Sequence, residues 1–224
     1  GVGRDQGFGT SARGLAVRTA DPTGEEFPAF TEFWVEAPAP GATEVTLHAL
    51  LESESLTGVY RFEARPGDET VVQVDATLYP RRGVERFGLA PLTSMFLFDA
   101  KNRSRFDDFR GAVCDTNGLQ IVTGSGERVW RPMANPVELQ VSSFIDERPK
   151  GFGLMQRNRE FEDFGDTEAR YERRPSVWVE PVEGFERGSV VLIEIPLEQE
   201  FNDNIVAYWQ PERPLEAGVP RRFS

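Results

Sequence analysis

The sequence predicts an all-β fold, and a large antiparallel β-sandwich is the architecture that fits it best. Short segments of alternating apolar and polar residues follow one another closely along the chain. Between them lie 21 Gly and 16 Pro, and Phe (17) far outnumbers Met (3). Aromatic-rich runs with frequent Gly and Pro between them are typical of many short strands joined by turns. Few or no long helices are therefore expected.

The N-terminal third of the chain predicts a meander of neighbouring strands. A Gly-rich entry over residues 7–20 ends in an alternating strand, and residues 29–36 form the next one. Three closely spaced alternating runs follow, at 45–49, 59–65 and 70–78. Each run keeps its apolar residues on one face, which is the pattern of half-buried antiparallel strands.

The remaining strands are separated by turns and by one charged insertion. Further strands are expected at 89–98, which is the most apolar stretch, and at 139–144, 151–156, 177–180, 189–195 and 205–209. Asn117-Gly118 is a strong turn signal, and Gly124-Ser125-Gly126 is another. These signals place Asp115 just before a turn.

Residues 157–174 carry many charges, with Phe161, Phe164 and Tyr171 among them. A segment of this kind in a strand-rich domain is either a functional loop or a solvated flap with aromatic anchors, and the pattern favours neither. A helical turn or two is expected around 167–173. The Pro- and Gly-rich stretch 211–220 has the composition of an interdomain linker. The abrupt start at Gly1 suggests a fragment or a processed piece.

Composition argues against several classes of function. The formal net charge is −12, so the chain would repel nucleic acid and an anionic membrane surface, whereas a neutral sugar polymer would not be repelled. No apolar run approaches the length of a membrane span. The chain has one Cys, Cys114, and one His, His48, which makes a zinc site and Ser-His-Asp catalysis poor candidates.

One polar connection stands out between two strand-like segments. Asn202-Asp203-Asn204 lies between 189–196 and 205–209, where a rigid scaffold can present a working side chain. Asn amides can donate to a carboxylate and fix its rotamer, as a catalytic acid requires. The same tripeptide also favours a simple turn, which local sequence alone prefers.

Other residue patterns add only weak evidence of function. The acidic residues Asp163, Asp166 and Glu168 lack the spacing of a calcium loop and suggest a solvated patch. Aromatic residues distributed over the β-scaffold support a weak carbohydrate hypothesis, because aromatic faces stack on sugars. They are Trp34, Trp130, Tyr171, Trp178 and Trp209.

Longer motifs, spread in order along the whole chain, carry a resemblance to one family. They are SARGLA (11–16), GEEFP (24–28), APLTSMF (90–96), DTNGL (115–119), GERVWRP (126–132), PKGFGLMQR (149–157), ARYERRPSVWVEP (169–181) and NDNIVAYW (202–209). These strings closely resemble the periplasmic glucan biosynthesis proteins OpgG/MdoG and OpgD.

The resemblance implies a fold, a compartment and a polymer substrate. Residues 1–210 would be the second half of the family's large β-sandwich domain. Residues 211–224 would begin the linker to a missing C-terminal immunoglobulin-like domain. The family acts in the periplasm on osmoregulated glucans with a β-1,2-linked glucose backbone, and members are understood to be inverting glycoside hydrolases. Neither a cofactor nor a metal is implied, and no membrane insertion.

The resemblance also implies catalytic roles. Asp203 matches the family's general acid and Asp115 its general base, and the family's usual His before the base is Cys114 here. Inverting hydrolysis needs one protonated carboxyl for the leaving oxygen and one carboxylate to activate water on the opposite ring face. We therefore expect both Asp side chains to face one cleft, with 157–174 overhanging it and Tyr171 pointing inward.

Further residues are expected to bind the glucan. They are Tyr171, Arg174, Trp130, Arg131, Asn117 and Asn204. Two other functions use the same groove: a non-catalytic glucan-binding biosynthesis factor, and a transglycosylase that excludes water. Cleavage separates hydrolysis from binding, and new linkages in the product would identify the transglycosylase.

Overall fold

The computed structural model describes residues 8–224, so the chain's opening at Gly1 and the first residues of the predicted 1–210 domain lie outside the described part. Strands dominate, and helix is limited to α1 (Phe161–Phe164) and the 3-10 turns η1 (Arg103–Arg105) and η2 (Tyr171–Arg173). The predicted all-β class is therefore confirmed. Within residues 8–224 no helix has the length and apolar character needed to cross a membrane.

The strands have the following bounds. They are β1 (Ser11–Ala12), β2 (Ala16–Val17), β3 (Ala29–Val35), β4 (Val45–Glu52), β5 (Leu56–Arg65), β6 (Val71–Pro80), β7 (Phe87–Ser94), β8 (Phe96–Phe98), β9 (Val113–Cys114), β10 (Gly118–Val122), β11 (Arg128–Pro132), β12 (Gln140–Glu147), β13 (Gly151–Met155), β14 (Val177–Val179), β15 (Arg187–Glu194), β16 (Ile205–Pro211) and β17 (Arg221–Phe223).

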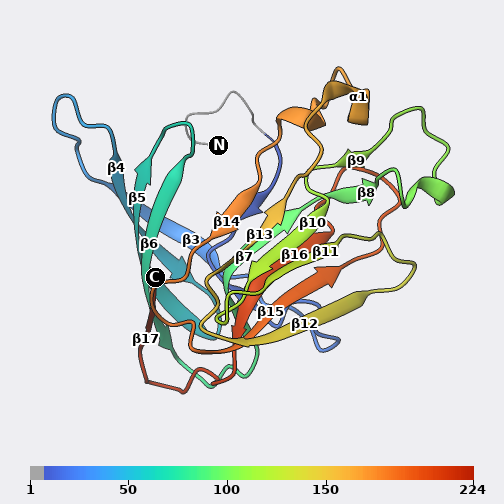
Figure 1. Cartoon of the computed structure of the whole chain (residues 1–224). Helices are drawn as coiled ribbons and strands as arrows, with labels where there is room; N and C mark the ends of the chain where they lie inside the picture. Colours follow the sequence, from blue (N-terminus) through green and yellow to red (C-terminus); the bar gives the residue numbers. More distant parts are fainter. Residues whose placement is uncertain (1–7) are drawn as a thin grey trace.

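The strands form antiparallel sheets, with the five-stranded sheet on the left of Figure 1. Its order is β17-β6-β5-β4-β3, so the predicted meander is confirmed. A six-stranded sheet runs β1-β7-β16-β15-β12, with β2 also paired to β7. A four-stranded sheet runs β11-β10-β13-β14, and β8 pairs with β9. Large side chains from these sheets, among them Tyr60, Trp209 and Phe152, are almost fully buried in one core.

The centre of the six-stranded sheet is deeply buried. In β15 every residue after Arg187 is buried, because the strand has neighbours on both edges and packing on both faces. Strand β7 lies on the other side of β16, and the β7–β16 register shifts between Ala207 and Trp209. Ala90 of β7 has a positive φ of 48°. Such an irregularity bends a strand and re-aims the residues beyond it. The residues beyond Ala90 include Thr93 and Ser94.

The turn predicted at Asn117-Gly118 is wrong. Gly118 is the first residue of β10 and pairs with Pro132 and Met155, and its φ is not positive. The glycine is needed for a different reason. A Cβ at this position would lie 2.1 Å from the Trp130 ring, so the absence of a side chain makes room for that ring.

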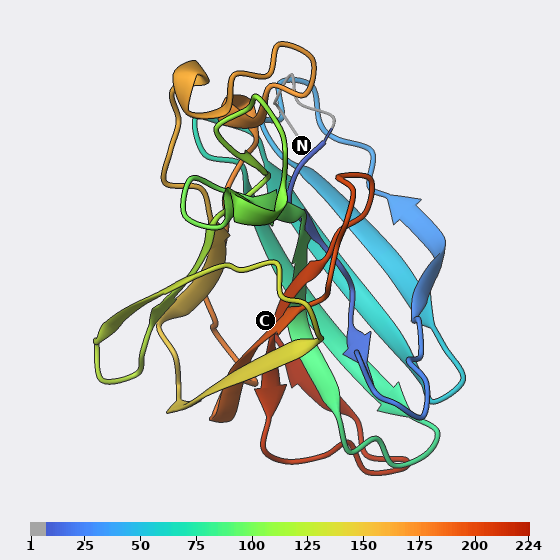
Figure 2. The same cartoon turned by 90° about the vertical axis from the view of Figure 1, so that its right-hand side faces the viewer.

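Three long loops meet at one end of the molecule. They connect β8 to β9 (99–112), β13 to β14 (156–176) and β15 to β16 (195–204). Figures 1 and 2 show the green and orange loops together at the top of both views. The middle loop contains the charged insertion with α1 and η2. Of these, η2 falls in the range 167–173 where a helical turn was expected, and α1 was not predicted.

The tail over 211–224 is packed against the domain. Leu215 is 2% exposed and its backbone pairs with Val84, while Phe223 is 5% exposed within β17. Strand β17 adds to the edge of the five-stranded sheet beside β6. A linker was expected from the Pro and Gly content of 211–220. Pro and Gly are equally common in turns, and here they form the turns that lead into the edge strand β17. The division of the chain at residue 210 stays a prediction.

The burial of β15 predicts a measurable difference between two valines. Val190 is fully buried in the core, whereas Val182 is 81% exposed in a loop. We expect Val190→Ala to lower the free energy of unfolding by about 2 kcal/mol, because two buried methyl groups are lost and a cavity remains. Val182→Ala is the matched control and should stay within about 0.5 kcal/mol. Equal losses in urea denaturation would contradict this packing.

Candidate functional site

A three-residue segment at the end of β7, Thr93–Met95, holds both predicted catalytic residues. Thr93 Oγ1 donates to Asp203 Oδ2 at 2.7 Å. Two residues later, the backbone of Met95 accepts from the Asp115 N–H at 2.8 Å. Between them, Ser94 O accepts from the backbone N–H of Asn204 at 3.1 Å. Asp115 and Asp203, 88 positions apart in sequence, are thus attached to one short stretch of strand.

Asp203 lies at the open side of this arrangement. Its side chain is 33% exposed, and its Oδ2 is 3.4 Å from Arg13 Nη2 as well as bonded to Thr93. We expected the flanking Asn amides to fix its rotamer. The observed partners are instead Thr93 and Arg13, which come from the APLTSMF and SARGLA motifs.

Asn204 is a buried clamp between strands. It is 1% exposed, its Oδ1 accepts from Phe96 N at 2.8 Å, and its Nδ2 donates to Phe96 O and Ile195 O, both at 3.0 Å. All of its amide groups are therefore used within the protein. This position suits a residue that fixes the start of β16, and with it the adjacent Asp203.

Asp115 lies in the interior beside an arginine. It is 3% exposed, and its Oδ1 accepts from Arg174 Nη1. Burial raises the pKa of the Asp115 carboxyl, the Arg174 guanidinium counteracts that rise, and the negative charge of Asp203 adds to it.

Arg174 and Tyr171 form the wall next to Asp115. Arg174 Cζ lies 4.2 Å from the centre of the Tyr171 ring, and Tyr171 is 2% exposed, so this ring is packed in the interior. The orientation of Tyr171 toward a substrate cleft stays a prediction. Gln156 was missed by sequence reasoning. Its Nε2 donates to the backbone oxygens of Asp115 (3.1 Å) and Tyr171 (2.7 Å), and so it ties the loop to the residue that it covers.

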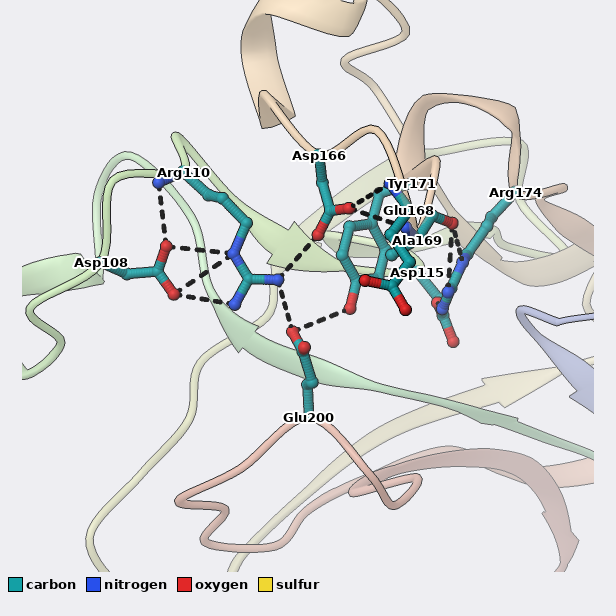
Figure 3. Close-up of polar contacts among 9 residues, drawn as sticks. All are labelled: Asp108, Arg110, Asp115, Asp166, Glu168, Ala169, Tyr171, Arg174 and Glu200. Atoms are coloured by element: carbon teal, nitrogen blue, oxygen red, sulfur yellow. Dashed lines mark hydrogen bonds and ion pairs between the residues drawn. The ribbon is translucent and has the colours of Figure 1, made fainter.

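A second cluster missed by sequence reasoning is centred on Arg110 (Figure 3). Its guanidinium contacts Asp108, Asp166 and Glu200, each with an N–O distance of 2.8 Å. Glu200 also accepts from Tyr171 Oη at 3.0 Å. Asp166 is therefore not part of a solvated acidic patch, as its sequence neighbourhood suggested. It is 9% exposed and has a guanidinium partner.

The remaining predicted binding residues are placed on or beside the four-stranded sheet. Trp130 lies half-buried over Gly118, and Arg157 Cζ lies 5.0 Å from its ring centre. Arg131 bonds to Glu194 at 2.8 Å, and Glu194 is fully buried. Asn117 is half-buried, and its side-chain oxygen accepts from Arg157 N at 3.0 Å.

Cys114, the residue before Asp115, is buried. Its thiol is 1% exposed, and burial, with the charges of Asp99 and Asp115, raises its pKa. A buried, protonated thiol packs like a small apolar side chain. Among residues 8–224 no group of three or more His, Cys, Asp or Glu is arranged to hold a metal ion.

Two surface hollows lie away from these residues. One of about 210 Å³ has Arg86, Val191 and Tyr208 in its lining, and one of about 280 Å³ has His48 and Arg222. No side chain of the predicted site lines either hollow. The candidate site is thus defined by its two carboxyls and the loops around them: one exposed enough to meet a ligand, the other buried and paired with Arg174.

One protein family matches the chain over its whole length. The profile of a family described as "Periplasmic glucan biosynthesis protein, MdoG" matches residues 1–224. A protein of Vibrio cholerae named "Glucans biosynthesis protein G" is 53% identical over 223 residues, covering 100% of this chain. "Glucans biosynthesis protein G 1" of Shewanella oneidensis is 52% identical over the same length. The chain spans 41% of the length of each of these relatives.

Two of the carboxyls should affect stability in opposite directions as the pH changes. The native pKa of Asp115 is raised, so its contribution is complete below the unfolded pKa of about 3.9 and is lost as the pH rises through the native pKa. Burial disfavours the Asp166 carboxylate, but the Ala169 N–H, Arg110 and the Glu168 N–H outweigh this and lower its pKa. Its contribution is present above the unfolded pKa and is lost as the pH falls through the native pKa.

Chemical denaturation at a series of pH values checks these signs. The free energy of unfolding of the wild type minus that of Asp115→Asn should fall as the pH rises above about 4. The corresponding difference for Asp166→Asn should rise as the pH increases toward about 4. The same slope for both variants would show that their environments are not those described.

Proposed function

The chain belongs to the MdoG family of periplasmic glucan biosynthesis proteins, and we propose that it carries the two catalytic aspartates of a periplasmic glycoside hydrolase that cleaves β-1,2-linked glucan. The observation that carries this proposal is the attachment of Asp203 and Asp115 to the same segment, Thr93–Met95. One carboxyl is accessible and the other is buried beside a guanidinium. Two carboxyls in unlike environments are the basis for separate acid and base roles.

Asp203 is the proposed general acid. The Asp203 side chain is 33% exposed, so its carboxyl can reach a glycosidic oxygen bound at the open side of the site. Its Oδ2 accepts a hydrogen bond from Thr93. Fixing the rotamer in this way leaves Oδ1 for the substrate. Proton transfer from a carboxyl requires a heavy-atom distance of about 2.6–3.2 Å to the leaving oxygen.

Asp115 is the proposed general base. A base must be ionised, and the Arg174 guanidinium favours the ionised form of a carboxyl that burial would otherwise protonate. As the base, Asp115 accepts a proton from the attacking water. Because Asp115 is only 3% exposed, that proton reaches it either directly from a water at the protein surface or through an intervening hydroxyl. Inverting hydrolysis requires this water to attack from the ring face opposite Asp203.

The glucan is proposed to lie along the wall made by the four-stranded sheet and the 156–176 loop. Trp130, Asn117 and Arg131 offer an aromatic face and polar groups there. Arg174, whose side chain is 11% exposed, lies closer to the two carboxyls. We assign Tyr171 to supporting Arg174 rather than to sugar binding, because Tyr171 is 2% exposed and its Oη donates to Glu200. We assign Asn204 to positioning rather than to sugar binding, because its amide is buried and bonded on both sides. A neutral polymer suits a chain with a net charge of −12.

A non-catalytic glucan-binding factor is the second candidate function. The observation that favours it is the ion pair between Arg13 and Asp203, which engages the carboxyl of the proposed acid. A binding factor would use the same wall and would not need Asp203. A transglycosylase would need both aspartates but would pass the sugar to another glucan hydroxyl instead of water.

Linear β-1,2-glucan distinguishes these functions. We expect the product of the complete gene to release oligosaccharides from it, and Asp203→Asn and Asp115→Asn each to lower kcat by about 10²–10⁴-fold, because each removes one proton-transfer group. Asp75→Asn is the matched control, since Asp75 lies 47% exposed on the five-stranded sheet, and it should retain full activity.

The other outcomes would support a different function or a different mechanism. Binding of the polymer without cleavage by the wild type would identify a glucan-binding factor. Products with new linkages would identify a transglycosylase. Full activity in Asp203→Asn would remove this residue from the mechanism.

A further inference from the structure

We propose that Arg110 is a positioning residue that holds the Arg174–Asp115 pair in its working geometry from a distance. This inference rests on the proposed function, because it names a residue required by that reaction. Arg110 lies in the 99–112 loop, and its guanidinium pairs with Asp108, Asp166 and Glu200 rather than with Asp115 or Asp203. Its influence has to pass through the residues between them (Figure 3).

The Arg110 guanidinium is itself fixed by Asp108. Nε lies 3.0 and 3.2 Å from the two carboxylate oxygens of Asp108, and Nη2 lies 2.8 Å from one of them. This two-pronged contact leaves Nη1 pointing at the other two loops. Paired geometry of this kind gives orientation as well as energy. The Arg110 side chain is 14% exposed, so water competes little for these bonds.

The first route from Arg110 to the site passes through Asp166. Nη1 donates to Asp166 Oδ2 at 2.8 Å, and Asp166 Oδ1 accepts from the backbone N–H of Glu168 and of Ala169. The carbonyl of the same Ala169 accepts from Arg174 Nε at 3.4 Å and Nη2 at 3.3 Å. Asp166 thus shapes the turn whose carbonyl orients Arg174.

The second route passes through Glu200 and Tyr171. Nη1 also donates to Glu200 Oε2 at 2.8 Å, and that oxygen accepts from Tyr171 Oη at 3.0 Å. The Tyr171 ring then supports the Arg174 guanidinium on its face. Both routes begin at one nitrogen of Arg110 and end at Arg174, so displacement of Arg110 loosens Arg174 from two directions.

The charges around Arg110 make it hard to replace. One guanidinium faces three carboxylates, those of Asp108, Asp166 and Glu200. Without it these carboxylates repel one another, and the three loops that carry them separate. Lys would keep the positive charge but not the fork that reaches three partners.

Arg110→Met tests the proposal in the product of the complete gene. We expect kcat on β-1,2-glucan to fall about 10- to 100-fold, because the base is misplaced. KM should change less, since Arg110 does not touch substrate. The acid limb of the pH profile should move to higher pH, because a looser Arg174 no longer lowers the pKa of Asp115. Arg110→Lys should recover part of kcat.

Hydrogen exchange gives a readout that does not need activity. The amides of Glu168 and Ala169 should exchange faster in Arg110→Met, while those of the buried strand β15 keep their protection and show that the variant is folded. Arg187→Met is the matched control, because Arg187 forms an exposed pair with Glu212 and should change neither readout. If Arg110→Met does not fold, the same measurements on Arg110→Lys decide.

The outcomes separate this inference from the proposed function. Unchanged exchange at Glu168 and Ala169 overturns the inference whatever the activity. Faster exchange with an unchanged kcat and pH profile also overturns it, because the loop would be held without being needed. Lack of cleavage by the wild type overturns the proposed function, and exchange alone then decides whether Arg110 orders the loop over Asp115.

Discussion

The buried ion pair between Asp115 and Arg174 is the constraint on which the rest of the site depends. A carboxylate that is 3% exposed is costly unless a partner stabilises its charge, and Arg174 is that partner. Arg174 is a long, flexible side chain, so it needs supports of its own. Tyr171 lies under its guanidinium, and the Ala169 carbonyl accepts from it. Much of the charged loop can be understood as the structure that holds one arginine against one aspartate.

The rigid sheets supply the other half of this arrangement. Strand β7 belongs to the deeply buried six-stranded sheet, and its last residues anchor both carboxyls. The irregularity at Ala90 turns these residues toward the loops. Asn204, just before β16, bonds to the backbone of Phe96 in β8 and so joins these two strands. The exposed Asp203 and the buried Asp115 are therefore both attached to the end of one sheet strand, and the loops supply the other contacts around them.

Local patterns predicted the strands well because alternation and burial are properties of neighbouring residues. The same reasoning failed wherever a partner is distant in sequence. Arg110 has its partners Asp166 and Glu200 at 56 and 90 positions along the chain, which no local pattern reveals. Asn117-Gly118 has the composition of a turn, but packing against Trp130 decides its conformation. Resemblance to a family singled out Asp115 and Asp203 as the expected catalytic residues. It could not predict that Thr93 and Arg13 are the side chains that contact Asp203.

The most direct test is a crystal structure of the Asp203→Asn variant, made from the complete gene, with a bound β-1,2-linked oligosaccharide. The account predicts a glycosidic oxygen about 2.6–3.2 Å from the residue 203 side chain. It also predicts an ordered water, or a sugar hydroxyl leading to one, at the Asp115 carboxylate on the opposite face of the ring. An oligosaccharide bound away from both residues, for example along the outer face of the five-stranded sheet, would contradict the assignment of the two aspartates.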